Sequence, residues 1–184
     1  LEKRKERFAV FIEAFEGFFQ MIDFNFVDHP FAQSRTGKLG LIMVTSDEGF
    51  MGGLNRRVID KALGYPGADE AELIIIGERG AAYLQGMGRA FTQFPGIVGD
   101  ERYEAAMRLK DFILKEGLAE KFSRLILIYP KPVTFTVQEI EELTILPCSD
   151  LLKKREKLLE KGEYVIIESS MGGIIEYLLE SWIA

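Results

Sequence analysis

The sequence contains one cysteine and one histidine, and these scarcities exclude several kinds of chemistry. Cys148 has no second cysteine, so an intrachain disulfide is excluded and a reducing compartment fits better than secretion. We interpret Cys148 as a small apolar residue. His29 has no second histidine and no nearby cysteine, which argues against a zinc site.

Long apolar runs and basic stripes are also missing. No stretch reaches the roughly 18 continuous apolar residues of a membrane-spanning helix, and no signal peptide is visible. A net charge of −6 without a basic stripe argues against nucleic acid as a partner. The 184 residues are 47% hydrophobic and 28% charged, which is typical of one globular domain with a core.

Catalytic signatures are few. The G-x-S-x-G pattern is absent, and the single histidine has no serine or cysteine nucleophile in a recognisable setting. The local cluster of Glu139, Glu141 and Glu142 is interpreted as solvated surface. We therefore expect no catalytic residue, no metal and no cofactor in this chain.

What the sequence does contain is an alternation of strand and helix patterns. Continuous apolar runs predict buried strands, and apolar residues three and four apart predict helices. The predicted strands are 39–45, 72–77, 89–94, 124–130, 133–138, 142–147 and 164–169. The predicted helices are 3–22, 54–63, 78–86, 100–116 and 174–183, while 150–161 is helical or looped.

This order predicts a three-layer, Rossmann-like α/β fold with a mostly parallel sheet. The strands at 133–138 and 142–147 leave no room for a helix between them, so they predict an antiparallel extension. We expect a single domain over 1–184, with the sheet in 38–169. The chain begins and ends inside helical patterns, and we expect a central piece of a longer protein.

The Phe-rich helix at 3–22 has one wide apolar face. Two interpretations stay open: it packs on the core of the domain, or it binds in a groove or a coiled coil. A stand-alone scaffold that docks a partner through this helix stays a further hypothesis.

The stretch Thr45 to Asn55, TSDEGFMGGLN, lies between a predicted strand and a predicted helix, where α/β proteins hold phosphates. Its glycines do not match G-x-G-x-x-G, and it has no lysine of a phosphate loop. Asp47 and Glu48 would repel a phosphate. Asp47 is a possible Mg²⁺ ligand, but no second carboxylate cluster supports it. A Rossmann-like module that binds a phosphate or small molecule stays the alternative hypothesis.

The other interpretation of this loop is structural. Its glycines allow backbone angles that are closed to other residues and let two backbones approach. Its first polar residues can accept hydrogen bonds from free amides at the turn and the helix start. The candidate residues of this structural or subunit-contact loop are Thr45, Ser46, Asp47, Gly49, Gly52, Gly53 and Asn55.

The loop also resembles the T-S-D-x-G-[LF]-x-G-G-x-N stretch of the gamma subunit of F-type ATP synthases. Further matches follow in the family's order, and they cover essentially the whole chain. They are His29-Pro30, IIIGERG at 74–80, LILIY with Phe135 and Gln138, and Leu146-Pro147. Glu48 and Met51 depart from the family, which often has a basic residue and a cysteine there.

The resemblance implies a non-catalytic rotor subunit of the central stalk, which couples ion translocation to ATP synthesis or hydrolysis. Residues 1–25 would end one long helix and 171–184 would begin another, so the fold would carry remnants of two long terminal helices. The implied partners are the alpha and beta subunits, the epsilon subunit and the membrane c-subunit ring. The implied location is the cytoplasmic face of the membrane, as a peripheral part of the complex.

Overall fold

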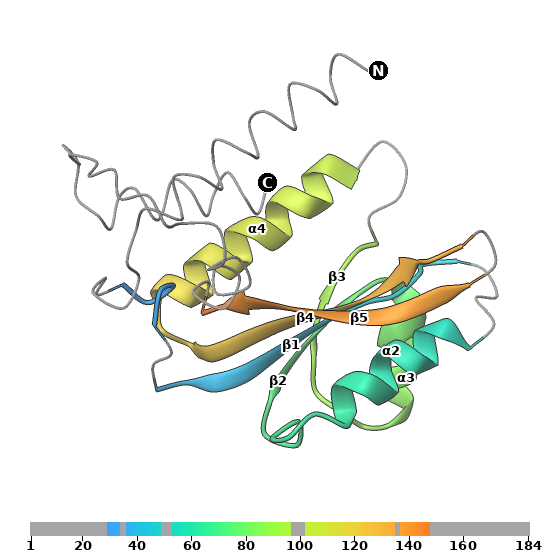
Figure 1. The fold of residues 1–184 in the computed structure, drawn as a ribbon, viewed down its shortest axis with the longest axis horizontal. Helices are drawn as coiled ribbons and strands as arrows, with labels where there is room; N and C mark the ends of the chain where they lie inside the picture. The colour runs from blue at the N-terminus through green and yellow to red at the C-terminus, as the bar shows by residue number, and fades with distance from the viewer. Residues whose placement is uncertain (1–28, 34–35, 49–52, 97–101, 135–136, 148–184) are drawn as a thin grey trace, which may run out of the picture.

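A computed structural model describes residues 29–33, 36–48, 53–96, 102–134 and 137–147, drawn in colour in Figure 1. The predicted segments at 3–22, 150–161, 164–169 and 171–184 lie outside these residues, and so does Cys148. The described elements are β1 (Lys38–Val44), α2 (Leu54–Leu63), β2 (Glu72–Ile76), α3 (Glu78–Gly86), β3 (Thr92–Phe94), α4 (Arg102–Leu118), β4 (Phe122–Pro132) and β5 (Gln138–Leu146).

The strands form one sheet in the order β3-β2-β1-β4-β5. Strands β3, β2, β1 and β4 run parallel to one another, and β5 runs antiparallel to β4. The predicted α/β fold with a mostly parallel sheet and an antiparallel extension is therefore confirmed. The strand 89–94 is shorter than predicted, since β3 begins only at Thr92.

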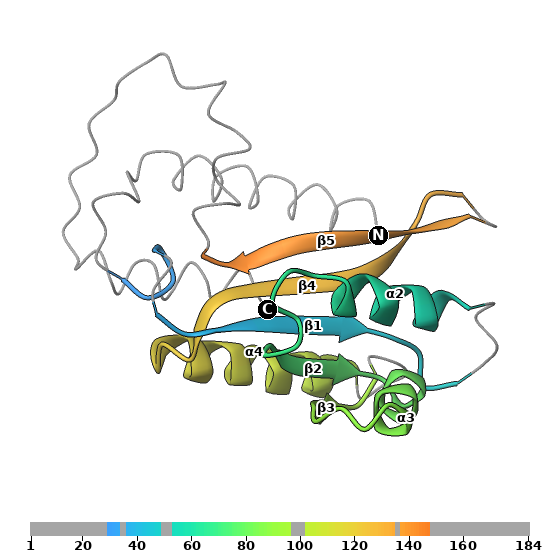
Figure 2. The same cartoon turned by 90° about the horizontal axis from the view of Figure 1, so that it is seen from below.

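Helices cover both faces of the sheet, which gives the three predicted layers. Figure 1 shows α4 on one face of the sheet and α2 with α3 on the other. In Figure 2, where the domain is seen from below, α2 lies along the sheet. Alternate residues of each strand point to opposite layers. In β1, Leu41 and Met43 pack in the cluster beneath α2 and α3, while Ile42 packs in the cluster beneath α4.

The hairpin of β4 and β5 differs from the prediction. The sequence predicts three short strands, whereas the structure has two long ones, with β4 ending at Pro132 and β5 beginning at Gln138. The predicted strand at 133–138 is wrong for its described residues 133, 134 and 137, because β4 continues through Pro130 to Pro132 instead of ending before them. Pairing with β1 stops at Ile128, so both prolines lie where β4 has β5 as its one neighbour in the sheet. A missing N–H is tolerated at such a position.

Lys121 joins α4 to the sheet next to two aromatic rings. Its Nζ lies 2.6 Å from Oε1 of Glu72 on β2 and 2.9 Å from Oε2 of Glu116 on α4. The same nitrogen lies 5.9 Å from the ring centre of Phe112 and 5.8 Å from that of Phe122. The hydrogen bonds to Glu72 and then Glu116 raise the pKa of Lys121 above its ordinary value.

Because the pKa of Lys121 is raised in the folded state, the contribution of its ion pairs to stability depends on pH. The ammonium is favoured in the folded state, so its contribution is complete below pH 10.5 and is lost as pH rises through the folded pKa. We expect Lys121→Met to lower the free energy of unfolding by roughly 1 kcal/mol at pH 8. The difference in melting temperature from the parent should shrink at higher pH. Lys115→Met, at an exposed position on α4, is the control. A difference that stays constant well above pH 10.5 would contradict the ion-pair account.

Candidate functional site at the carboxyl end of the sheet

Thr45 follows β1 directly and ties it to the next parallel strand. Its backbone N–H donates to the carbonyl oxygen of Ile76 at 2.8 Å, and its hydroxyl donates to the same oxygen at 2.7 Å. The hydroxyl oxygen also accepts from the N–H of Gly80 at 3.2 Å. Thr45 is buried, so these partners take the place of water.

Ser46 and Asn55 connect the loop to the start of α2. The side-chain Oδ1 of Asn55 accepts from the N–H of Ser46 at 3.2 Å, and its Nδ2 donates to Oγ of Ser46 at 2.9 Å. The carbonyl of Ser46 accepts from the N–H of Arg79 at 3.0 Å, on α3. Ser46 therefore joins the first turns of two helices.

Asp47 joins β1 to two more elements. Its Oδ1 accepts from the N–H of Glu78, the first residue of α3, at 3.0 Å. The same oxygen accepts from the N–H of Gly96, just beyond β3, at 3.1 Å. One carboxylate thus holds three neighbouring strand ends together, because β1, β2 and β3 all finish at this edge.

These contacts occupy the amino end of α3. The first N–H groups of a helix have no partner within the helix, and they are the groups that bind phosphate in α/β folds. Here those of Glu78, Arg79 and Gly80 donate to Asp47, Ser46 and Thr45 respectively. The geometry therefore argues against a phosphate at this helix end. The sequence indicates that these polar residues accept from amides, but not that the amides belong to α3.

Three glycines that the sequence prediction missed allow close contacts here, with backbone atoms at Gly77 and with side chains at Gly80 and Gly96. Gly77 has a φ of 98°, and a Cβ there would lie 2.8 Å from the backbone C of Thr45. A Cβ at Gly80 would lie 2.6 Å from Ile75 Cδ1, and one at Gly96 would overlap the Asp47 carboxylate. The IIIGERG pattern was a visible signal for the first two. Only the fold reveals the third.

The glycines that were predicted give a different result. Gly53 precedes α2 with a φ of 81°, as the structural interpretation expects. No described atom lies within 4 Å of where its Cβ would stand, so among the described residues Gly53 has no close approach. Gly49 and Gly52 lie outside the described residues.

The acidic cluster on β5 is more paired than the sequence suggests. Glu141 Oε1 lies 2.8 Å from Lys131 Nζ, and its Oε2 accepts from the Tyr129 hydroxyl at 3.2 Å. Burial, and then this hydrogen bond, raise the pKa of Tyr129. Glu142 lies 3.6 Å from Lys61 of α2. The side chains of Glu141 and Glu142 are 38% and 45% exposed, so the interpretation as solvated surface holds, and both also form surface ion pairs.

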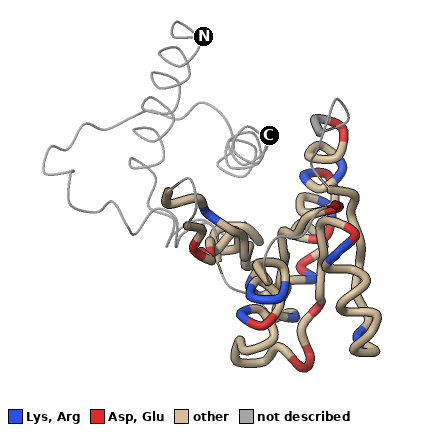
Figure 3. The backbone as a smooth tube through the Cα atoms, turned by 90° about the vertical axis from the view of Figure 1, so that its right-hand side faces the viewer, with Lys and Arg blue, Asp and Glu red and all other residues tan. Residues whose placement is uncertain are grey.

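The other candidate positions in the described residues do not bring together the side chains of a binding or metal site. His29 is buried, and its Nδ1 accepts from the N–H of Phe31 at 3.3 Å. Within the described ranges, no three His, Cys, Asp or Glu residues gather as metal ligands would. None of the described helices combines the length and the apolarity of a membrane span. Basic and acidic residues are interspersed along the described backbone (Figure 3).

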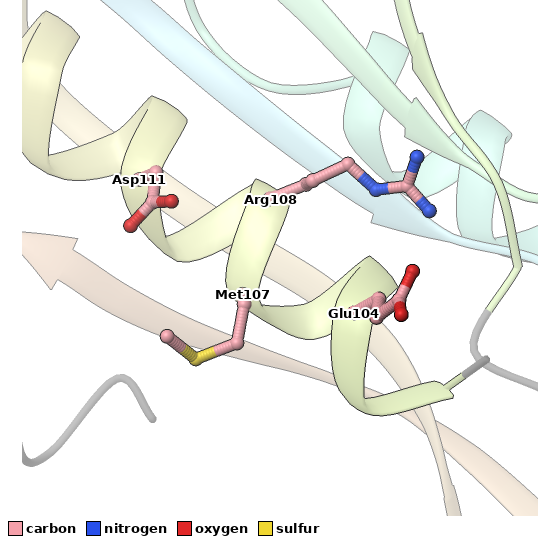
Figure 4. Close-up of a pocket in the computed structure, with 4 residues that line it drawn as sticks. All are labelled: Glu104, Met107, Arg108 and Asp111. Carbon is pink, nitrogen blue, oxygen red and sulfur yellow. The ribbon is translucent and has the colours of Figure 1, made fainter. Parts of the chain in front are cut away.

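One open hollow lies on α4, with a volume of about 410 Å³ (Figure 4). Its lining residues are Glu104, Met107, Arg108 and Asp111. They recur at intervals of three and four, so they all come from one face of a single helix. No polar group from another described element converges with them, and the hollow does not resemble a built ligand site.

Comparisons with known proteins all find similarity to ATP synthase proteins. The family model described as ATP synthase matches residues 1–184. The gamma chain of the ATP synthase of Trichlorobacter lovleyi is 26% identical over 159 residues, which cover 82% of this chain and 54% of that protein. The gamma chain of Ruminococcus albus is 26% identical over 193 residues, which cover 99% and 66%. The chain spans about half the length of most curated relatives that it matches.

A solved structure shares the fold. It is a chain in the central stalk and c-ring of the mitochondrial ATP synthase of Tetrahymena thermophila, with a TM-score of 0.57. The sequence identity is 18%, and the match covers 82% of this chain and 67% of that chain. At this identity the likeness supports the arrangement of the elements.

Proposed function

This chain belongs to the ATP synthase family, among relatives that are gamma chains, and we propose that it is a domain of a rotor subunit in the central stalk. In this role it does no chemistry itself. It braces a rotating shaft that couples ion translocation to ATP synthesis or hydrolysis. The observation that carries the proposal is the family match over residues 1–184.

The geometry of the loop supports a bracing role. The side chains of Thr45, Ser46 and Asp47 all form contacts that join the end of β1 to β2, α2, α3 and the residues just beyond β3. Such contacts fix the relative positions of the elements, and they occupy amides that a nucleotide would need at α3. The candidate loop residues are therefore proposed as a structural junction. The alternative hypothesis of a phosphate-binding module loses its main support.

The partners follow from the same family membership. We propose contacts with the alpha and beta subunits, the epsilon subunit and the membrane c-subunit ring, on the cytoplasmic face of the membrane. The Tetrahymena structure that shares the fold comes from a central stalk with its c-ring, which supports this placement. The domain would be a peripheral part of the assembly.

The first experiment is a pull-down of the affinity-tagged, full-length native protein from detergent-solubilised membranes, with its companions identified by mass spectrometry. We expect nucleotide-binding alpha and beta subunits to be recovered with it. An untagged strain controls for adventitious capture. Recovery of the protein alone, or only from the soluble fraction, would overturn the rotor proposal. Calorimetric titration with ATP and with inorganic phosphate would then test the binding-module alternative.

A further inference from the structure

Helix α2 sends two basic side chains to the backbone of β5, the last strand of the described sheet. Nη1 of Arg57 lies 3.5 Å from the carbonyl oxygen of Gln138, and Nζ of Lys61 lies 3.1 Å from that of Ile140. Both are contacts between residues far apart in the sequence. They place side-chain donors of the helix on backbone acceptors of the strand, and Lys61 Nζ also lies 3.6 Å from Oε2 of Glu142.

The two carbonyls face away from β4. The hairpin closes with the N–H of Val133 donating to the carbonyl of Val137 at 2.9 Å, which makes that pair hydrogen-bonded. Pairs alternate along an antiparallel ladder, so Gln138 and Ile140 occupy non-hydrogen-bonded pairs. Their partners on β4 are both prolines, which have no N–H to donate. The carbonyls of these two residues therefore point to the outer edge of the sheet.

The spacing of the helix matches the spacing of the strand. Residues four apart on an α-helix lie on one face and about 6 Å apart along the axis. Outward carbonyls two residues apart on a strand are about 6.8 Å apart. Arg57 and Lys61 can therefore meet successive outward carbonyls of β5 from one helix face. The apolar face of α2 holds it on the sheet, with Val58 and Ile59 fully buried.

We propose that Arg57 and Lys61 block the outer edge of β5 against pairing with a strand from a second copy of this chain. Unpaired N–H and C=O groups on an edge strand are a template for another strand, and charged side chains on the edge oppose such pairing. No strand in the described part of the chain pairs with this edge of β5. The strand, QEIEELTIL, has nine residues, and Ile140, Thr144 and Ile145 are of the types that favour β-structure. This proposed role of Arg57 and Lys61 does not depend on the rotor proposal.

The test replaces both donors in the full chain with methionine, as Arg57→Met with Lys61→Met. Methionine keeps an unbranched side chain and helix propensity but removes the charge and the donors. We expect the double variant to associate at concentrations about tenfold or more below those at which the parent associates. Sedimentation velocity over a concentration series measures this, and circular dichroism checks folding. Lys61→Met alone, which removes the shorter contact, repeats the test if the double variant does not fold.

Two further variants separate an edge effect from a general loss of charge. Arg56→Met with Arg108→Met removes two exposed charges elsewhere and should leave the mass distribution of the parent unchanged. Glu142→Pro, at the next outward position of β5, removes an outward N–H and should reverse the association of the double variant. The proposal is overturned if the double variant keeps the parent's mass, or if it associates equally with proline at position 142.

Discussion

Gly77→Ala is expected to lower the free energy of unfolding by roughly 4 kcal/mol. Two effects combine in this value. The φ of 98° is strained for any residue with a side chain, and the added methyl would lie 2.8 Å from the backbone C of Thr45 and 3.0 Å from that of Ser46. Backbone atoms cannot move aside as the end of a side chain does. The N–H of Gly77 also donates to the carbonyl of Phe94 at 3.1 Å, which resists a shift.

Two other glycines separate strain from crowding. Gly88 has a φ of 68°, and no described atom lies within 4 Å of where an added methyl would stand, so Gly88→Ala should carry strain alone, about 1 kcal/mol. Gly86 lies in α3 with equal space, and Gly86→Ala should be neutral or stabilising by up to about 1 kcal/mol. Urea denaturation followed by circular dichroism measures all three. If Gly77→Ala destabilises no more than Gly88→Ala, the close approach to Thr45 has no energetic weight.

Asp47→Ala is expected to lower the free energy of unfolding by roughly 2 kcal/mol. The carboxylate accepts from the N–H of Glu78 and from that of Gly96, and removal of the side chain leaves both without this acceptor. Water can reach the Glu78 amide, which limits the loss there. A negative charge at the amino end of α3 is also lost, and such charges are stabilising.

The readout that is specific to this account is amide hydrogen exchange. The N–H groups of Glu78 and Gly96 should exchange faster in Asp47→Ala, beyond the change that global stability causes. Asp47→Asn keeps an acceptor oxygen and should lose only part of the stability. Asp69→Ala is the matched control, because the Asp69 side chain is 99% exposed and pairs with Arg89 at the surface. Unchanged local exchange in Asp47→Ala would refute the role of this carboxylate as a junction.

The sequence predicts the interior of the fold well, because burial leaves a strong pattern. The runs LGLIMV and LIII are apolar at every position, since strands between two helical layers are buried on both faces. Helix α2 is predicted with the bounds that the structure shows, 54–63, because Gly53 and Gly64 mark its ends. These signals are local, and each lies within a few residues of the element that it defines.

What the sequence could not give is the partner of each polar group. Asp47 is recognisable as a turn residue, yet its partners lie 31 and 49 residues away. The strands of the hairpin are predicted wrongly for a related reason. A proline ends a strand that has two neighbours but not the part of a strand that has one, and the number of neighbours is a property of the sheet. Arg57 and Lys61 likewise read as ordinary surface charges until β5 is placed beside α2.

The overhang of β4 and β5 beyond β1 has a mechanical consequence. From Tyr129 to Pro132 the sheet narrows to two strands, over a length of about 13 Å. A two-stranded ribbon twists and bends more easily than a broad sheet clad with helices on both faces. Arg57 and Lys61 of α2 contact this ribbon at the carbonyls of Gln138 and Ile140. A sideways force on the hairpin would therefore pass partly to α2, and the overhang acts as an arm that the helix supports from one side.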